Sequence, residues 1–72
     1  MDNMYYVYAY DKIWKDWMCC ECSTYEEAKF VRDKWESFSD RNRVTIENGL
    51  RKRRASMYVI EDGWISKKED WS

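Results

Sequence analysis

The segment from Ser23 to Phe38 constrains the fold most, because it carries the clear helical periodicity of the chain. Its first residues form a capping box, in which the Thr24 hydroxyl accepts from an orphan backbone N–H and the Glu27 carboxylate reaches back. At about 100° per residue, four apolar residues share one stripe: Ala28, Val31, Trp35 and Phe38. One amphipathic helix cannot bury such a stripe alone, so we predict a helix over 24–38 that lies against a sheet.

Two strands are predicted before this helix. From Met4 to Tyr10 the sequence is rich in Tyr and Val, and alternation places Val7 and Ala9 on the helix side. A second strand is expected from about Trp17 to Cys22. Its residues on the helix side are Met18, Cys20 and Cys22. The opposite face of the two strands then carries a row of aromatic side chains, namely Tyr6, Tyr8, Tyr10 and Trp17.

Three further strands are predicted after the helix. A tight hairpin at Asn48-Gly49 would place Arg51 and Arg53 on the buried face, so we expect a longer connection over 48–54. Asp62-Gly63 is the better hairpin signal, and it sets Ile60 opposite Ile65. The expected fold class is α+β, an antiparallel sheet of four to five strands in the order ββαβββ with one helix packed on one face. All 72 residues are assigned to a single small domain.

The aromatic side chains support the leading functional hypothesis. Five Trp and six Tyr are more than one small core under one helix can bury. We expect no cover for the second sheet face, on which Met57, Val59 and Trp64 are also placed. Tyr and Trp are enriched at protein interfaces, and Phe30 lies off the buried stripe of the helix. The residues predicted to bind a partner protein are Tyr6, Tyr8, Tyr10, Trp17, Trp64 and Phe30.

The charges give an alternative. The net charge is −1, but residues 41–54 hold six basic side chains against the single acid Glu47. The basic run consists of Arg51, Lys52, Arg53 and Arg54. It either meets phosphates while the aromatic face stacks on unpaired bases, or it is a solvated loop that protects a sheet edge. Single-stranded nucleic acid is therefore the second partner class that we consider, and a homodimer joined through the aromatic face is the third.

Several function classes are disfavoured. The chain has no His for a Ser-His or Cys-His pair, and its two Gly provide no phosphate-binding loop, so we do not expect an enzyme. The three Cys lack a fourth zinc ligand, so we expect neither a metal nor a cofactor. Cys20 and Cys22 are interpreted as small core residues, and Cys19 as exposed. Reduced thiols and the absence of a long apolar run lead us to expect a cytoplasmic protein that does not contact a membrane.

The layout resembles that of very short phage-encoded anti-CRISPR proteins, notably of the type I-F inhibitor group. The matching features are the strand from Tyr5 to Tyr10, the helix start from Ser23 to Ala28, and the Asp62-Gly63 hairpin. The resemblance is one of order and pattern over most of the chain, and it assigns no functional residue. It implies a stoichiometric inhibitor that binds a host protein complex and obstructs its nucleic-acid site. The leading hypothesis is thus a non-enzymatic protein-binding module of this inhibitory type.

Overall fold

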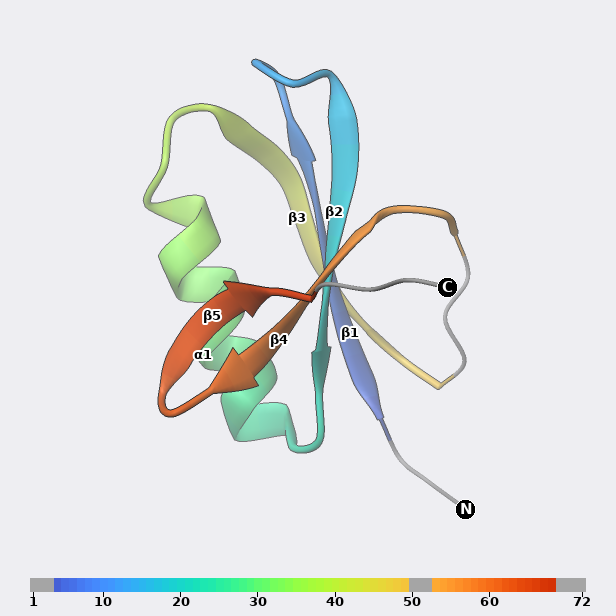
Figure 1. Ribbon diagram of the computed structural model, residues 1–72, viewed down its shortest axis with the longest axis vertical. Coiled ribbons are helices and arrows are strands. Elements are labelled where there is room, and N and C mark those ends of the chain that lie inside the picture. The colour runs from blue at the N-terminus through green and yellow to red at the C-terminus, as the bar shows by residue number, and fades with distance from the viewer. Residues whose placement is uncertain (1–3, 50–52, 69–72) are drawn as a thin grey trace.

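The computed structural model describes residues 4–49 and 53–68, and these form one helix and five strands (Figure 1). The elements follow the predicted order ββαβββ. They are β1 (Tyr5–Asp11), β2 (Asp16–Cys22), α1 (Tyr25–Glu36), β3 (Arg41–Asn48), β4 (Ser56–Glu61) and β5 (Trp64–Lys67). The fold is α+β, as expected.

The predicted helix is confirmed, but it is shorter than the periodicity indicated. Thr24 is its N-cap, and the Thr24 hydroxyl accepts from the Glu27 backbone N–H at 3.1 Å. The Glu27 carboxylate accepts from the backbone N–H of Ser23 at 2.9 Å, one residue before the donor that a capping box uses. The helix ends at Glu36, so Phe38 lies beyond it and is 49% exposed. Its placement in the buried stripe was wrong.

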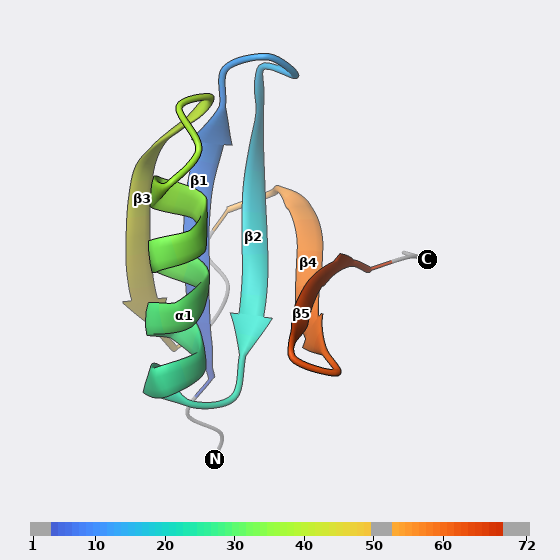
Figure 2. The ribbon, with the colours of Figure 1, turned by 90° about the vertical axis from the view of Figure 1, so that its left-hand side faces the viewer.

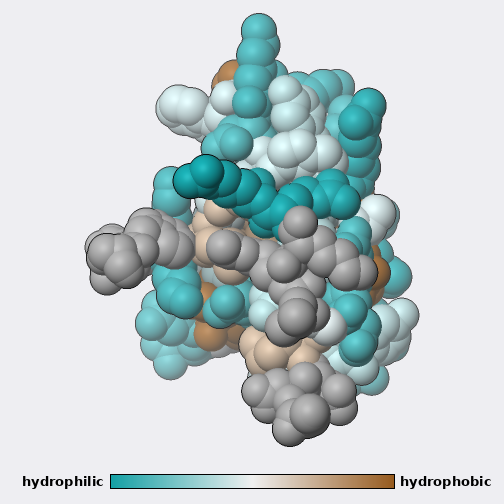
Figure 3. Space-filling model, turned by 90° about the vertical axis from the view of Figure 1, so that its right-hand side faces the viewer, coloured by the Kyte–Doolittle hydropathy of each residue, from teal (hydrophilic) through white to brown (hydrophobic). Residues whose placement is uncertain are grey.

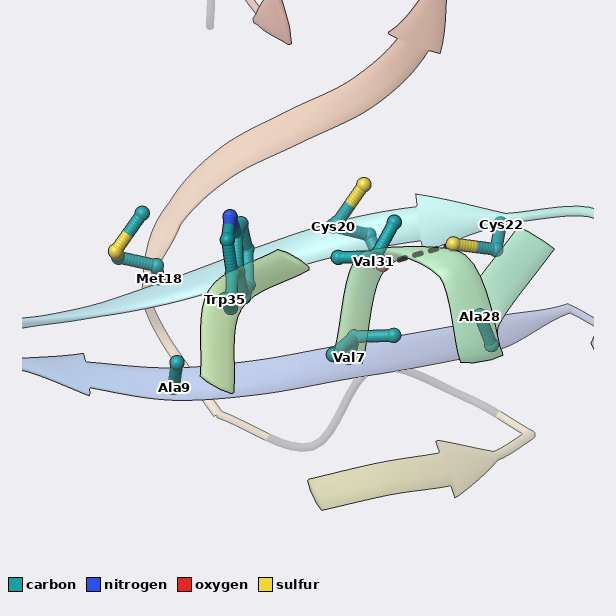
Figure 4. Close-up of a cluster of buried hydrophobic side chains, with 8 residues drawn as sticks. All are labelled: Val7, Ala9, Met18, Cys20, Cys22, Ala28, Val31 and Trp35. Atoms are coloured by element: carbon teal, nitrogen blue, oxygen red, sulfur yellow. Dashed lines mark hydrogen bonds between the residues drawn. The ribbon is translucent and has the colours of Figure 1, made fainter. Parts of the chain in front are cut away.

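The main core lies between α1 and the sheet, and it confirms which strand residues face the helix. Val7 and Ala9 of β1 meet Ala28, Val31 and Trp35 of α1 (Figure 4). Burying apolar side chains from two elements against each other is the main stabilising term in so small a fold. Three residues of β2 complete the cluster: Met18, Cys20 and Cys22.

The sheet is mixed, which corrects the expectation of a fully antiparallel sheet. Its strand order is β3-β1-β2-β4-β5, and β2 pairs with β4 in parallel. The prediction specified antiparallel pairing and gave no strand order. In the structure β3 pairs with β1 at one side of the sheet, and the expected longer connection after Asn48 leads to β4 on the far side of β2. The β4–β5 hairpin is confirmed, with Ile60 opposite Ile65.

The sheet face opposite α1 is partly covered, contrary to expectation. The connection between β3 and β4 runs on that face, as Figures 1 and 2 show for its described part. Ala55 of this connection packs on a second cluster formed by Tyr8, Cys19 and Met57. Tyr8 and Cys19 have no exposed surface, so the expectation of an exposed Cys19 was also wrong. In the space-filling view of this face, a strongly hydrophilic band crosses the middle (Figure 3).

Candidate binding groove between α1 and the β4–β5 hairpin

A groove of about 350 Å³ lies between α1 and the β4–β5 hairpin. It forms because α1 packs against β3, β1 and β2, while the hairpin extends the sheet beyond the side of the helix (Figure 2). Helix, hairpin and the start of β3 each contribute to its lining. The lining residues are Met18, Phe30, Lys34, Trp35, Phe38, Arg41, Tyr58, Trp64 and Ile65.

Aromatic side chains dominate this groove. Trp35 is only 3% exposed and meets the Tyr58 ring edge-on, with the centroids 5.6 Å apart. Three rings around them are open to solvent: Phe30 is 38%, Phe38 49% and Trp64 71% exposed. Exposed large apolar residues that gather in one groove are characteristic of interaction sites, whereas scattered ones are ordinary. Phe30 comes from α1, Phe38 from the turn after it and Trp64 from β5, so only the folded chain unites the three rings.

The groove also carries positive charge without a lining carboxylate. The Arg41 guanidinium lies 4.8 Å from the Phe38 centroid and 6.0 Å from that of Trp35, and it is 3.8 Å from the buried Asp11 carboxylate. The Lys34 ammonium lies 5.8 Å from the Phe30 centroid. Within the described residues, Lys34 has no acidic partner. One positive charge at an apolar groove therefore remains uncompensated.

Burial raises the pKa of the Tyr58 phenol; Asp11 and Asp16 raise it further, and Arg41 opposes them. Tyr58 is thus a neutral phenol at physiological pH. The groove accordingly offers aromatic surface, one phenol and one free cation. These groups suit the burial of an apolar side chain next to a carboxylate.

The structure places two of the six predicted partner-binding residues in the groove and leaves the other four outside it. Phe30 and Trp64 both line the groove, whereas Trp64 was expected to lie beside the tyrosines. Tyr8 is fully buried, so it is unavailable to a partner. Tyr6 and Trp17 are half-buried against the second cluster, and Tyr10 packs edge-on against Trp17 with the centroids 5.4 Å apart.

Phe38, Lys34 and Arg41 were not predicted as members of the site. One available signal was the spacing of Phe30 and Lys34, which are four residues apart and so lie on the same face of the helix, off the buried stripe. The role of Arg41 had no local signal, because it depends on the turn that follows α1.

The basic run is only partly described. Arg51 and Lys52 lie outside the described residues. Arg53 lies across the aromatic face, with its guanidinium carbon 4.8 Å from the Tyr8 centroid and 4.6 Å from that of Trp17. It also pairs with Glu47 at 3.5 Å, while Arg54 is exposed. The surface predicted to stack on bases is therefore occupied in part by a side chain of the same protein.

The cysteines are buried thiols. Cys20 and Cys22 belong to the main core, as predicted, and Cys19 belongs to the second cluster. The neighbouring Cys22 thiol and burial raise the pKa of the Cys20 thiol above its ordinary range. Among residues 4–49 and 53–68, no cluster of three or more His, Cys, Asp and Glu side chains has the geometry to hold a metal ion.

Comparison with protein-family models, with curated proteins and with solved structures finds no match to this chain. In the described part of the chain, no helix has the length and apolar character needed to cross a membrane. The function must therefore be inferred from the groove itself.

Proposed function

We propose that this protein is a non-enzymatic protein-binding module whose partner docks in the groove between α1 and the β4–β5 hairpin. The observation that carries the proposal is the gathering of the exposed Phe30, Phe38 and Trp64 around one groove. Aromatic side chains are enriched at protein interfaces, and the few residues that supply most of the binding free energy cluster near the centre of an interface.

The charge of the groove specifies the chemistry of the partner. The Arg41 charge is offset by Asp11, whereas the Lys34 charge is not offset by any described carboxylate. We therefore assign the groove to a protein segment that combines one or two large apolar side chains with an acidic residue. The apolar part supplies most of the affinity, and the carboxylate meets Lys34 and increases the association rate.

The layout resemblance extends this proposal to the biological role. It supports a cytoplasmic inhibitor, of the kind that phages encode, which binds a host defence or nucleic-acid-processing complex and blocks it stoichiometrically. Inhibition by occupancy requires a binding surface and no catalytic group.

The experiment is selection of a random-peptide display library against the purified protein. We expect the enriched peptides to combine Trp, Phe or Leu with Asp or Glu. Phe30→Ala and Trp64→Ala should each weaken such a peptide by about 30-fold, which corresponds to about 2 kcal/mol. Tyr25→Ala is the matched control, because Tyr25 is an exposed aromatic of the same helix and does not line the groove.

Peptides that bind Phe30→Ala and Trp64→Ala as tightly as the wild type would show that the groove is not the docking site. Sedimentation of the free protein addresses the homodimer. A dimer that dissociates on Trp64→Ala would assign the groove to self-association instead of to a separate partner.

A further inference from the structure

A second pocket, of about 430 Å³, lies beyond the groove, at the end of the sheet where β1 turns into β2. It is lined by residues of β1, the β1–β2 turn, β2 and β3. These are Tyr10, Lys12, Trp17, Asn42 and Arg43. The proposed groove shares none of them.

The composition of this pocket differs from that of the groove. Its two rings, Tyr10 and Trp17, are half-buried and pack edge-on, so they are held in place by each other. Lys12 and Arg43 are exposed, and neither has a carboxylate partner within the described residues. Two uncompensated cations, an amide and two rings therefore line a pocket that has no acidic lining residue.

None of the acids nearest in sequence lines the pocket. Asp11 accepts from the backbone of the β1–β2 turn and pairs with Arg41, which lines the groove on the helix side. Asp16 accepts from Ser56. Asp40 accepts from the Lys12 backbone through its carbonyl, and its carboxylate is not part of the pocket lining.

The backbone conformation sets the direction in which one of the two cationic side chains leaves β3. Arg43 has a φ of 57° and stands at a bulge in the pairing of β3 with β1, where the register shifts between Tyr8 and Tyr10. A left-handed residue at a bulge directs its side chain out of the regular alternation of the strand. Non-glycine residues adopt this conformation uncommonly, and asparagine would adopt it at lower cost than arginine.

From this arrangement we propose that the Tyr10–Trp17 pocket is a second binding site, which takes a single-stranded nucleic acid. One base stacks on the exposed part of the Tyr10 ring, because the Arg53 guanidinium already lies 4.6 Å from the Trp17 centroid, and Lys12 and Arg43 neutralise the flanking phosphates. Rings between uncompensated cations are the combination that binds single strands without sequence preference. A peptide of acidic residues alone would meet the cations but would leave the rings uncontacted.

The test measures fluorescence anisotropy of a labelled oligothymidylate of about eight nucleotides, a length within the usual site size. We expect binding that weakens with salt, with a slope of log K against log[salt] of about −1.4 for two phosphate contacts. The double variant Lys12→Gln/Arg43→Asn should lower the affinity at least tenfold and flatten the slope. It should retain the fold, because both side chains are exposed and asparagine suits the bulge.

Lys15→Gln is the matched control, since Lys15 is an exposed cation of the same turn and does not line the pocket. Tyr10→Leu should weaken binding about tenfold if a base stacks there, whereas Tyr10→Phe should not. Phe30→Ala and Trp64→Ala should leave oligonucleotide binding unchanged, which keeps this test separate from that of the groove.

Three results would overturn the proposal. The first is the absence of oligonucleotide binding at low salt. The second is an equal loss of binding in Lys15→Gln and in the double variant. The third is competition by polyglutamate as effective as that by unlabelled oligonucleotide, which would identify a general anion surface without base recognition.

Discussion

Replacing Arg53 tests whether the connection between β3 and β4 stabilises the second sheet face. The Arg53 guanidinium lies within 5 Å of the centroids of two rings, Tyr8 and Trp17. Partly exposed cation–π contacts contribute about 0.5–1 kcal/mol each. The ion pair with Glu47 adds only about a few tenths of a kcal/mol, because 40% of the Arg53 side chain is exposed and solvent screens the charge. Arg53→Ala should therefore lower the free energy of unfolding by about 1.5–2.5 kcal/mol.

Thermal and urea denaturation followed by circular dichroism measure this loss. For a chain of this size, about 1 kcal/mol shifts Tm by about 4–8 °C, so we expect a decrease of about 10 °C. Arg54→Ala is the matched control in the same connection, and an exposed substitution of this kind should stay within about 0.5 kcal/mol. Arg53→Lys should fall between the two, because lysine keeps the charge and loses the planar stacking.

A local measurement accompanies the global one. Cys19 lies in the second cluster together with Tyr8, so uncovering that cluster should expose its thiol. We expect Arg53→Ala to accelerate native-state labelling of Cys19, with much less effect on Cys20, which lies under α1. If Arg53→Ala and Arg54→Ala melt together and label at the same rate, Arg53 does not hold the connection on the sheet and the reasoning fails.

Two further predictions concern the main core. Trp35→Ala should cost about 3–5 kcal/mol, as large-to-small core changes do, and leave the protein largely unfolded by near-ultraviolet circular dichroism; a variant that melts within a few degrees of the wild type would contradict its burial. The raised pKa of Cys20 predicts a pH effect. The unfolded thiol ionises near its ordinary value of 9.0 while the folded one stays protonated, so unfolding free energy should fall above about pH 9 by up to about 1.4 kcal/mol per pH unit. If the urea midpoint of Cys20→Ala declines above pH 9 as much as that of the wild type, Cys20 is not the group that causes the pH dependence.

The local features of this fold could be read from the sequence, because each depends on neighbouring residues. The Thr24 cap needs only a hydroxyl three residues before a free N–H, and the burial of Ala28, Val31 and Trp35 follows from helical spacing. Alternation likewise placed Val7 and Ala9 under the helix correctly. The Asp62-Gly63 hairpin follows from the left-handed conformation that both residues adopt, with φ of 52° and 79°.

Strand order was decided only by the tertiary structure. The alternating pattern of β4 is the same whether it pairs with β3 or with β2, so no residue of β4 indicates which strand it pairs with. The parallel β2–β4 pair explains both corrections to the predicted site, which concern the aromatic sheet face and the position of Trp64. It places residues 53–55 of the connection on the second face, where Ala55 packs on the cluster around Tyr8, and it sets the hairpin beside α1 to form the groove. Phe30 and Trp64 were correctly singled out as aromatic residues, but their meeting in one groove depends on contacts between segments more than thirty residues apart in the chain.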